Sequence, residues 1–131
     1  MHIVYQKDEE GCGIACVAMV AGTTYRKAKD RLPKSWEIKG TTKKQMLKGL
    51  QSYAIATGKP KRIDTKDDYK QFEFDAVLHG FLDNELHWTV WDSKRGKLLD
   101  PYRPKLKFRC TSFIRIERRE RISANARRAR G

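Results

Sequence analysis

The sequence predicts an α+β fold in which helices come first along the chain and an antiparallel sheet follows. Two observations carry this prediction. Residues 13–21 are apolar on every side, which is typical of a buried central helix. From residue 74 onward, apolar runs of strand length are separated by short polar turns, a pattern that indicates consecutive hairpins. We therefore expect N-terminal helices packed on a C-terminal antiparallel sheet.

The helices are predicted from their apolar spacing and from the residues that end them. The central helix over residues 13–21 should end at Gly22, because glycine readily adopts the left-handed conformation found after helices. A short charged helix is expected over residues 25–31. A third helix begins after Gly40, carries apolar residues at helical spacing and is expected to end before Gly58.

The strands are predicted from apolar runs that are bounded by turn residues. Residues 83–85 and 93–96 are polar and form the expected turns of the main hairpins. The last expected strand alternates only weakly. From first to last, the expected strands cover residues 61–64, 74–82, 86–92, 97–100 and 113–116.

Length and charge indicate one domain and an anionic partner. The 131 residues fit a single domain, which we place at residues 1–117. Residues 118–131 end in Asn-Ala-Arg-Arg-Ala-Arg-Gly and are expected to form a basic, frayed or disordered tail. The net charge is +13, from 29 basic and 16 acidic residues. This balance favours nucleic acid or an acidic protein surface as a partner.

Three observations favour a soluble, cytoplasmic protein that does not contact a membrane. No apolar run approaches the roughly 20 residues that a membrane-spanning helix needs. The N-terminus becomes charged at Lys7, unlike a signal peptide. The three cysteines are an odd number, which argues against a disulfide framework, so we expect reduced thiols.

Cys12 is the candidate nucleophile, because it stands between Gly11 and Gly13 where the central helix should begin. A helix N-terminus presents unpaired N–H groups and the positive end of the helix dipole, and both favour a thiolate. The Cys12 N–H would face a developing oxyanion, and the Gln6 amide would supply a second donor. The alternative is a small buried core residue, which is the role expected for Cys16.

His87 and Asp100 are the candidate base and its orienting carboxylate. His87 opens an otherwise apolar strand and can reach across to the helix terminus, where it would take the thiol proton. Asp100 ends the next strand, so it can hold the other ring nitrogen of His87. Asp92 and His79 are weaker alternatives, because Asp92 faces away by strand alternation and His79 lies in the middle of a strand.

The residues resemble the papain-like cysteine peptidases that process bacteriocin leaders, the double-glycine peptidases. The resemblance runs over residues 5–104 and rests on four motifs in the expected order. They are Gln6 with Cys12-Gly-x-Ala-Cys-x-Ala-Met, then Gly40-Thr-Thr with Leu47 and Leu50, then His87-Trp-Thr-Val-Trp, and finally Leu98-Leu-Asp100-Pro101.

This resemblance implies a papain-like fold with the nucleophile at the start of the central helix. It also implies Cys12 as nucleophile, His87 as base, Asp100 as orienting residue and Gln6 as oxyanion donor. The chain departs from the family at Gly11, where an acidic residue is usual, and in its basic charge. We therefore expect the fold to be shared and the substrate to differ.

Three functions are consistent with these residues. The first is a thiol hydrolase that cleaves a peptide or isopeptide bond of a protein or peptide substrate. The second is a glutamine deamidase or transglutaminase with the same triad. The third is a catalytically silent basic module that binds nucleic acid or an acidic partner through its surface and its Arg-rich tail. No cofactor or metal is expected, because the sequence has no CxxC pair and no HExxH pattern.

Overall fold

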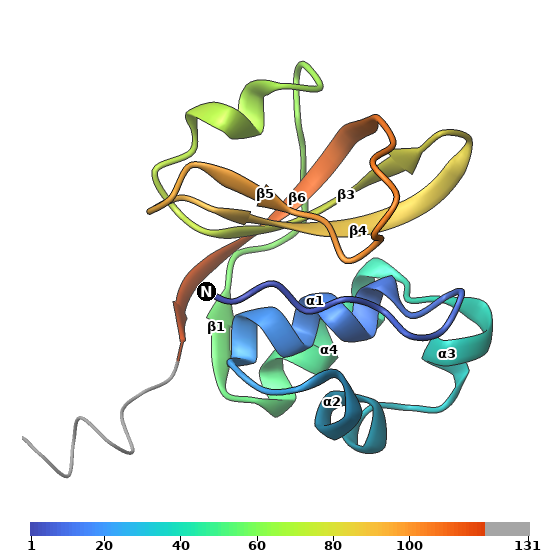
Figure 1. Cartoon of the computed structure of the whole chain (residues 1–131). Coiled ribbons are helices and arrows are strands. Elements are labelled where there is room, and N and C mark those ends of the chain that lie inside the picture. The colour runs from blue at the N-terminus through green and yellow to red at the C-terminus, as the bar shows by residue number, and fades with distance from the viewer. Residues whose placement is uncertain (120–131) are drawn as a thin grey trace, which may run out of the picture.

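The computed structural model describes residues 1–119, which form a helical layer and a sheet that lies across it (Figure 1). Within these residues, four α-helices precede the strands along the chain. The predicted α+β class, with helices packed on an antiparallel sheet, is confirmed. The helices are α1 (Cys12–Ala21), α2 (Tyr25–Arg31), α3 (Ser35–Lys39) and α4 (Lys43–Ser52). None of the described helices is long and apolar enough to cross a membrane.

The strands pair in the order β1-β6-β3-β4-β5, and β2 also pairs with β6. Every pairing is antiparallel. A short 3-10 helix, η1 (Asp68–Gln71), lies between β2 and β3. The strands are β1 (Ile55–Thr57), β2 (Lys61–Arg62), β3 (Ala76–Leu82), β4 (Glu85–Asp92), β5 (Lys97–Leu99) and β6 (Phe108–Arg119).

Helix α1 is the centre of the helical layer, and all ten of its residues are buried. It packs against β4 and against the other three helices. A helix that is apolar all round is stable only in such an interior position. Gly22 ends it in the left-handed conformation, with φ of 73°, and returns its N–H to the carbonyls of Ala18 and Met19. The predicted central helix and its end are therefore confirmed.

The sheet is covered on both faces. The face toward the helices carries Val77, Trp88 and Val90, which join the core around α1. The opposite face carries Leu78 and Trp91, which pack beneath the segment that contains η1 (Figure 1). Strand β4 is thus buried from both sides, and this holds His87 at the start of a rigid element.

Helix α4 ends earlier than the spacing predicted. Its last residue is Ser52, whereas the sequence pointed to an end just before Gly58. Ala54 adopts a positive φ of 57°, and Ile55 then enters β1 with its side chain buried in the core. Pairing with β6 therefore outweighs the local helical pattern at these residues.

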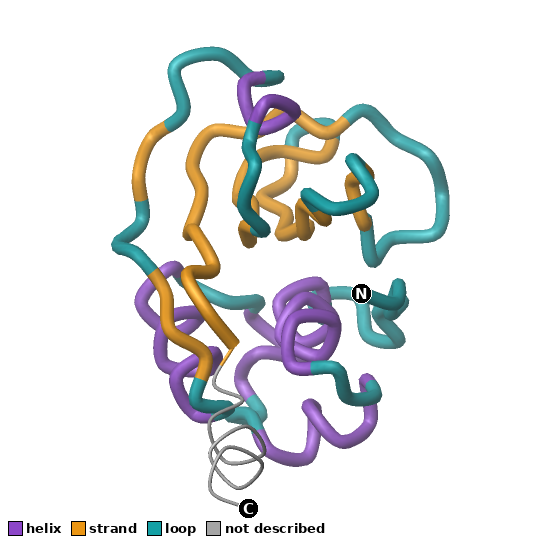
Figure 2. The backbone as a smooth tube through the Cα atoms, turned by 90° about the vertical axis from the view of Figure 1, so that its left-hand side faces the viewer, coloured by secondary structure: helices purple, strands orange, loops and turns teal. Residues whose placement is uncertain are grey.

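Strand β6 is much longer than the expected strand over residues 113–116, because it spans Phe108–Arg119. Figure 2 shows it running from the sheet past the helical layer, where it pairs with β1. Arg118 and Arg119 belong to this strand, so regular structure passes the domain boundary that we placed at residue 117. The remainder of the expected basic tail, residues 120–131, lies outside the described residues.

Candidate active site

Cys12 is the first residue of α1, and its side chain is only 6% exposed. The first helical hydrogen bond runs from the Ala15 N–H to the Gly11 carbonyl at 3.1 Å. The N–H groups of Cys12 and Gly13 precede that bond and have no partner within the helix, as at any helix start. The sulfur therefore sits at the positive end of the α1 dipole, beside donors that can stabilise an oxyanion.

His87 lies against Asp100, with Nε2 of the ring 2.7 Å from Oδ1 of the carboxylate. The same oxygen accepts the Tyr102 N–H at 2.9 Å, which fixes the carboxylate in place. The sheet register explains the contact: Leu99 of β5 pairs with Val90 of β4, so the chain after Leu99 runs back toward the start of β4. Asp100 thereby reaches His87 from the neighbouring strand.

The environment of His87 keeps its ring protonated near neutral pH. Burial pulls the pKa of His87 down, but a hydrogen bond to Asp100 and a hydrogen bond to Cys12 outweigh this, and the pKa rises to about 9. Because Nε2 is held by Asp100, Nδ1 is the ring nitrogen left for the thiol. The ring thus lies between a carboxylate and a thiol, which is the arrangement of a thiol nucleophile with its acid–base group.

The two alternative residues from the sequence have other partners. His79 of β3 lines one of the clefts at Cys12, but its ring lies against Trp88, with centroids 4.2 Å apart and a tilt of 38°. The pKa of His79 falls to about 4 because of burial and then of Lys43 and His87. Asp92 accepts the Arg95 N–H and forms an ion pair with the Arg95 side chain. The structure therefore brings Cys12, His87 and Asp100 together, and places neither Asp92 nor His79 in their roles.

Gln6 lies beside the same site but is engaged with the chain that precedes Cys12. Its amide Nε2 donates to the carbonyls of Asp8 and Glu9 at 3.1 and 3.0 Å. Its backbone N–H donates to the Pro101 carbonyl at 3.0 Å, which ties this segment to the one that carries Asp100. The amide has two hydrogens and both are used, so Gln6 reaches an oxyanion only by giving up one of these bonds.

Tyr25 and Lys29 of α2 hold the loop before Cys12. Tyr25 donates its hydroxyl hydrogen to the Asp8 carboxylate at 2.7 Å, and the Lys29 ammonium lies 3.1 Å from the same carboxylate. These contacts, the Tyr25 hydrogen bond above all, lower the pKa of Asp8 against the effect of its burial. Sequence reasoning missed this network, because its residues are far apart along the chain and each is ordinary in a helix or a loop.

The same network explains the departure at Gly11. A Cβ on Gly11 would lie 2.0 Å from the Tyr25 hydroxyl oxygen, so no side chain fits there while Tyr25 keeps its place. A side chain at position 11, acidic or not, would therefore require Tyr25 to move.

Residues 40–44 line the other side of Cys12. The indole N–H of Trp88 donates to the Thr41 carbonyl at 2.8 Å, which fastens this segment to β4. Thr41 packs so closely on Gly13 that a Cβ there would lie 2.3 Å from Thr41 Oγ1. The sequence indicated this segment only as the start of a helix and as part of the family resemblance, and its closeness to the nucleophile comes from the tertiary fold.

Two clefts meet at Cys12. One, of about 540 Å³, is lined by residues of the segment 39–44 and by His79 and Trp88. The other, of about 410 Å³, is lined by Gln6, His87 and the β3–β4 turn. Cys12, Glu10 and Leu86 line both clefts, so the two adjoin at the nucleophile candidate and together form one groove.

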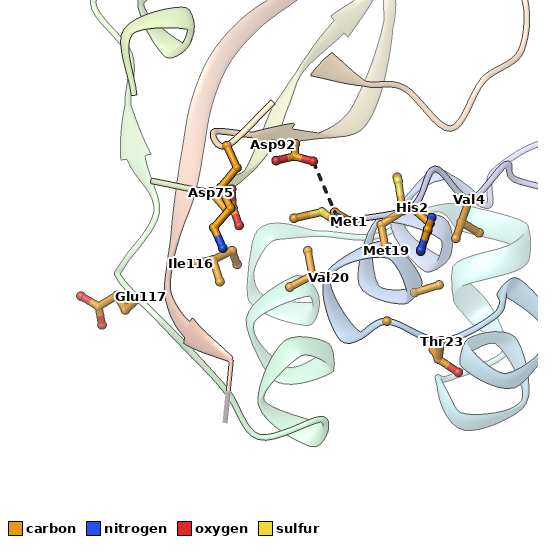
Figure 3. A pocket seen from close by; sticks show the side chains of 13 residues that line it. Met1, His2, Val4, Met19, Val20, Thr23, Asp75, Asp92, Ile116 and Glu117 are labelled. Atoms are coloured by element: carbon orange, nitrogen blue, oxygen red, sulfur yellow. Dashed lines mark ion pairs between the residues drawn. The ribbon is translucent and has the colours of Figure 1, made fainter. Parts of the chain in front are cut away.

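A cavity larger than either of these clefts is at the other end of α1 (Figure 3). It measures about 590 Å³ and is lined by Met1, Met19 and Asp92 among others, but by none of the proposed catalytic residues. Figure 3 shows Asp92 paired with the amino group of Met1, at a distance of 3.8 Å. In residues 1–119, no group of three or more His, Cys, Asp or Glu side chains could hold a metal ion.

This combination of fold and site defines a papain-like cysteine peptidase: a thiol starts the central helix, and a histidine from the sheet faces it. The sequence model of the peptidase C39 family matches residues 1–115. The chain belongs to the peptidase C39 family, as the resemblance in its motifs predicted, and it is therefore a hydrolase of the cysteine peptidase type. A search of the curated proteins finds no match.

Proposed function

We propose that the protein cleaves a peptide or isopeptide bond, with Cys12 as nucleophile, His87 as acid–base group and Asp100 as the residue that orients His87. The observation that carries the proposal is the position of the His87 ring, whose pKa is raised to about 9 by Asp100 and Cys12 despite its burial. The ring lies between a carboxylate and a thiol at a helix N-terminus, which is the arrangement that acid–base assistance to a cysteine nucleophile requires.

The reaction follows from these positions. With the thiol proton already held on Nδ1 of His87, the Cys12 sulfur attacks the substrate carbonyl. The negative charge that forms on the carbonyl oxygen rests against the Cys12 N–H at the start of α1. His87 then gives its proton to the departing amine as the C–N bond breaks, which leaves a thioester on Cys12.

The second half of the reaction uses the same groups in reverse. His87 accepts a proton from water, whose oxygen attacks the thioester carbonyl. The C–S bond breaks, the sulfur regains a proton from His87, and the acid product leaves. Asp100 keeps Nε2 of His87 occupied throughout, so that Nδ1 always faces the sulfur.

Gln6 is proposed as the second oxyanion donor. Its amide lies beside the cleft that contains Cys12 and His87. A carbonyl of Asp8 or Glu9 now accepts each of its N–H groups, so the substrate oxygen would replace one of these acceptors. Gln6 must give up a hydrogen bond to the loop before it can donate to the substrate, so its net contribution to binding the oxyanion is reduced. We therefore expect Gln6→Ala to lower kcat/KM by less than the roughly hundredfold loss typical of a fully free donor.

The proposal is tested with a degenerate peptide library and mass spectrometry. The wild-type chain should release new peptide termini, and Cys12→Ala should release none while unfolding at the same temperature. Cys110→Ala is the matched control, since Cys110 is also buried but lies in β6 away from the clefts, and it should keep its activity. Turnover by Cys12→Ala would refute the proposal.

The same measurement separates the alternative functions. Loss of ammonia from glutamine without a new terminus would indicate a deamidase or transglutaminase. Binding of nucleic acid that weakens steeply with salt, without any turnover, would indicate the silent basic module.

A further inference from the structure

The two clefts that meet at Cys12 carry charges of opposite sign. Three lysines line the cleft on the side of residues 39–44: they are Lys39, Lys43 and Lys44. Among the described residues, the cleft on the side of His87 has no lysine or arginine in its lining and contains three carboxylates of its own: Glu9, Asp83 and Glu85. Glu10 borders both clefts, at the point where they join.

These charges are free to meet a ligand. Each of the six side chains belongs to an exposed residue. Among residues 1–119, none of the six forms an ion pair, whereas carboxylates elsewhere, such as Asp8 and Glu37, are paired with Lys29. A cleft lined by unpaired carboxylates is notable in a chain whose net charge is +13, because general surface charge would place lysines there as well.

The position of His87 gives the groove a direction. His87 lines the acidic cleft and not the basic one. In peptide cleavage the protonated base must reach the nitrogen of the leaving amine, so the leaving segment lies on the side of His87. The acyl segment then extends the other way from Cys12, into the basic cleft along Thr41 and Lys43.

We infer that the substrate is a charge-polarised peptide, with acidic side chains on the N-terminal, acyl side of the scissile bond and basic side chains on its C-terminal, leaving side. The inference rests on the proposed function for its direction. Complementary charges on both sides fix which way the peptide lies in the groove, and so they select the bond as well as the sequence.

The size of the effect follows from the exposure of the charges. Solvent-exposed ion pairs contribute little singly, so several on each side together give a preference of roughly tenfold for the matching peptide over its reverse. Because exposed charges are screened over about 10 Å at 0.1 M salt, the preference should shrink as ionic strength rises.

The test uses two fluorescent peptides of identical composition. In one, glutamates precede and lysines follow a degenerate central segment, and in the other the order is reversed. Binding is measured by fluorescence anisotropy on the full chain carrying Cys12→Ala, at low and high salt. We expect roughly tenfold tighter binding of the first peptide at low salt, with the difference falling as salt is added. Equal binding of the two peptides, or no binding of either, would overturn the inference.

Charge-reversal variants locate the effect. Lys43→Glu with Lys44→Glu should remove or reverse the preference, and so should Glu85→Lys on the other side. Lys48→Glu with Lys59→Glu, at positions outside both clefts, matches the charge change of the double lysine variant, and Asp64→Lys matches that of Glu85→Lys. Both controls should leave the preference intact. If the control variants abolish it as well, net charge and not the groove is responsible, and the inference fails.

The wild-type chain then separates this inference from the proposed function. Matching peptides that bind with the expected polarity but are never cleaved would leave the polarity in place and refute the peptidase proposal. Peptides that are cleaved equally well in both orders would support the peptidase proposal and overturn the polarity.

Discussion

At its N-terminal end, α1 presents Cys12 to a histidine that is hydrogen-bonded to Asp100, whereas at its C-terminal end Gly22 closes the helix on its own carbonyls. Both ends open into a cleft, and the C-terminal end has the larger single cavity, about 590 Å³ against about 540 and 410 Å³. The comparison teaches that the larger cavity does not coincide with the proposed catalytic residues. These are distinguished by groups that can exchange a proton.

The carboxylates at the two ends show the same difference. Asp100 holds an imidazole, and it contributes to raising the pKa of His87 to about 9. Asp92, buried beside the larger cavity, is engaged with Arg95 and with the amino group of Met1. One carboxylate therefore supports the protonated form of a histidine beside a thiol, and the other joins structural elements.

The largest expected effect sharpens the comparison between the two histidines near Cys12. His87→Gln should lower kcat/KM by about a thousandfold, because it removes the group that moves the proton in both half-reactions. His79→Gln should change kcat/KM by less than about tenfold, since the His79 ring lies against Trp88 and no carboxylate of the described residues holds it. Steady-state kinetics on one peptide, with thermal unfolding of both variants, measures this. Equal losses in the two variants would contradict the site assignment.

The next effect compares the two carboxylates. Activity of the wild-type chain should fall as the pH rises through about 9, where His87 loses its proton. Asp100→Asn removes the anion that supports this proton, so the alkaline limb should move toward the ordinary value of 6.5 and activity at neutral pH should fall by roughly a hundredfold. Asp92→Asn should leave the profile unchanged. A pH–rate profile of the wild-type chain and of the two variants tests this prediction. An equal shift of the alkaline limb in both variants would contradict it.

Stability should change with pH in the same sense. Because the pKa of His87 is raised above 6.5 in the folded chain, its contribution to stability is fully present below pH 6.5 and disappears as the pH rises through about 9. Asp100→Asn should therefore destabilise the fold more at pH 6 than at pH 9.5. Urea unfolding of the wild-type chain and of Asp100→Asn at the two pH values measures this. If the two proteins differ in unfolding free energy by the same amount at both pH values, His87 is not charged in the folded chain.

The smallest effect compares the glycines at the two ends of the helix. Gly22→Ala places a side chain at a φ of 73° and should lower the free energy of unfolding by about 1 kcal/mol, with activity unchanged. Gly13→Ala forces Thr41 away from the start of α1 and should lower activity as well as stability. Urea unfolding and kcat/KM for both variants check this. A loss of activity in Gly22→Ala would show that the two ends are coupled.

The parts of the fold and site that sequence could predict are those with local signals. The apolar run of α1, the alternation along β4 and the hairpin that carries Asp100 after β5 all follow from short-range patterns. These three elements place Cys12, His87 and Asp100, so most of the site was predictable. Strand alternation also favoured Asp100 over Asp92 as the carboxylate beside His87, and Asp100 is the one that contacts it.

The remaining parts depend on contacts between distant residues. The early end of α4 reflects the pairing of Ile55 with β6, which no local pattern contains. The two bonds of the Gln6 amide arise from the shape of the loop before Cys12. The Lys and Glu residues of the two clefts look like ordinary surface charge along the chain, and only the tertiary fold sorts them by sign.

The central place of β6 also bears on how the chain folds as it is synthesised. All the proposed catalytic residues precede β6, yet β3 pairs with β6 on one side and with β4 on the other. Until β6 emerges, β3 has an open edge, and β4 lacks the support that positions His87 against α1. Pairings this distant along the chain form slowly. The nascent chain therefore carries Cys12 before the strand that supports the sheet around His87 has emerged, and we expect the proposed site to be complete only once β3 has paired with β6.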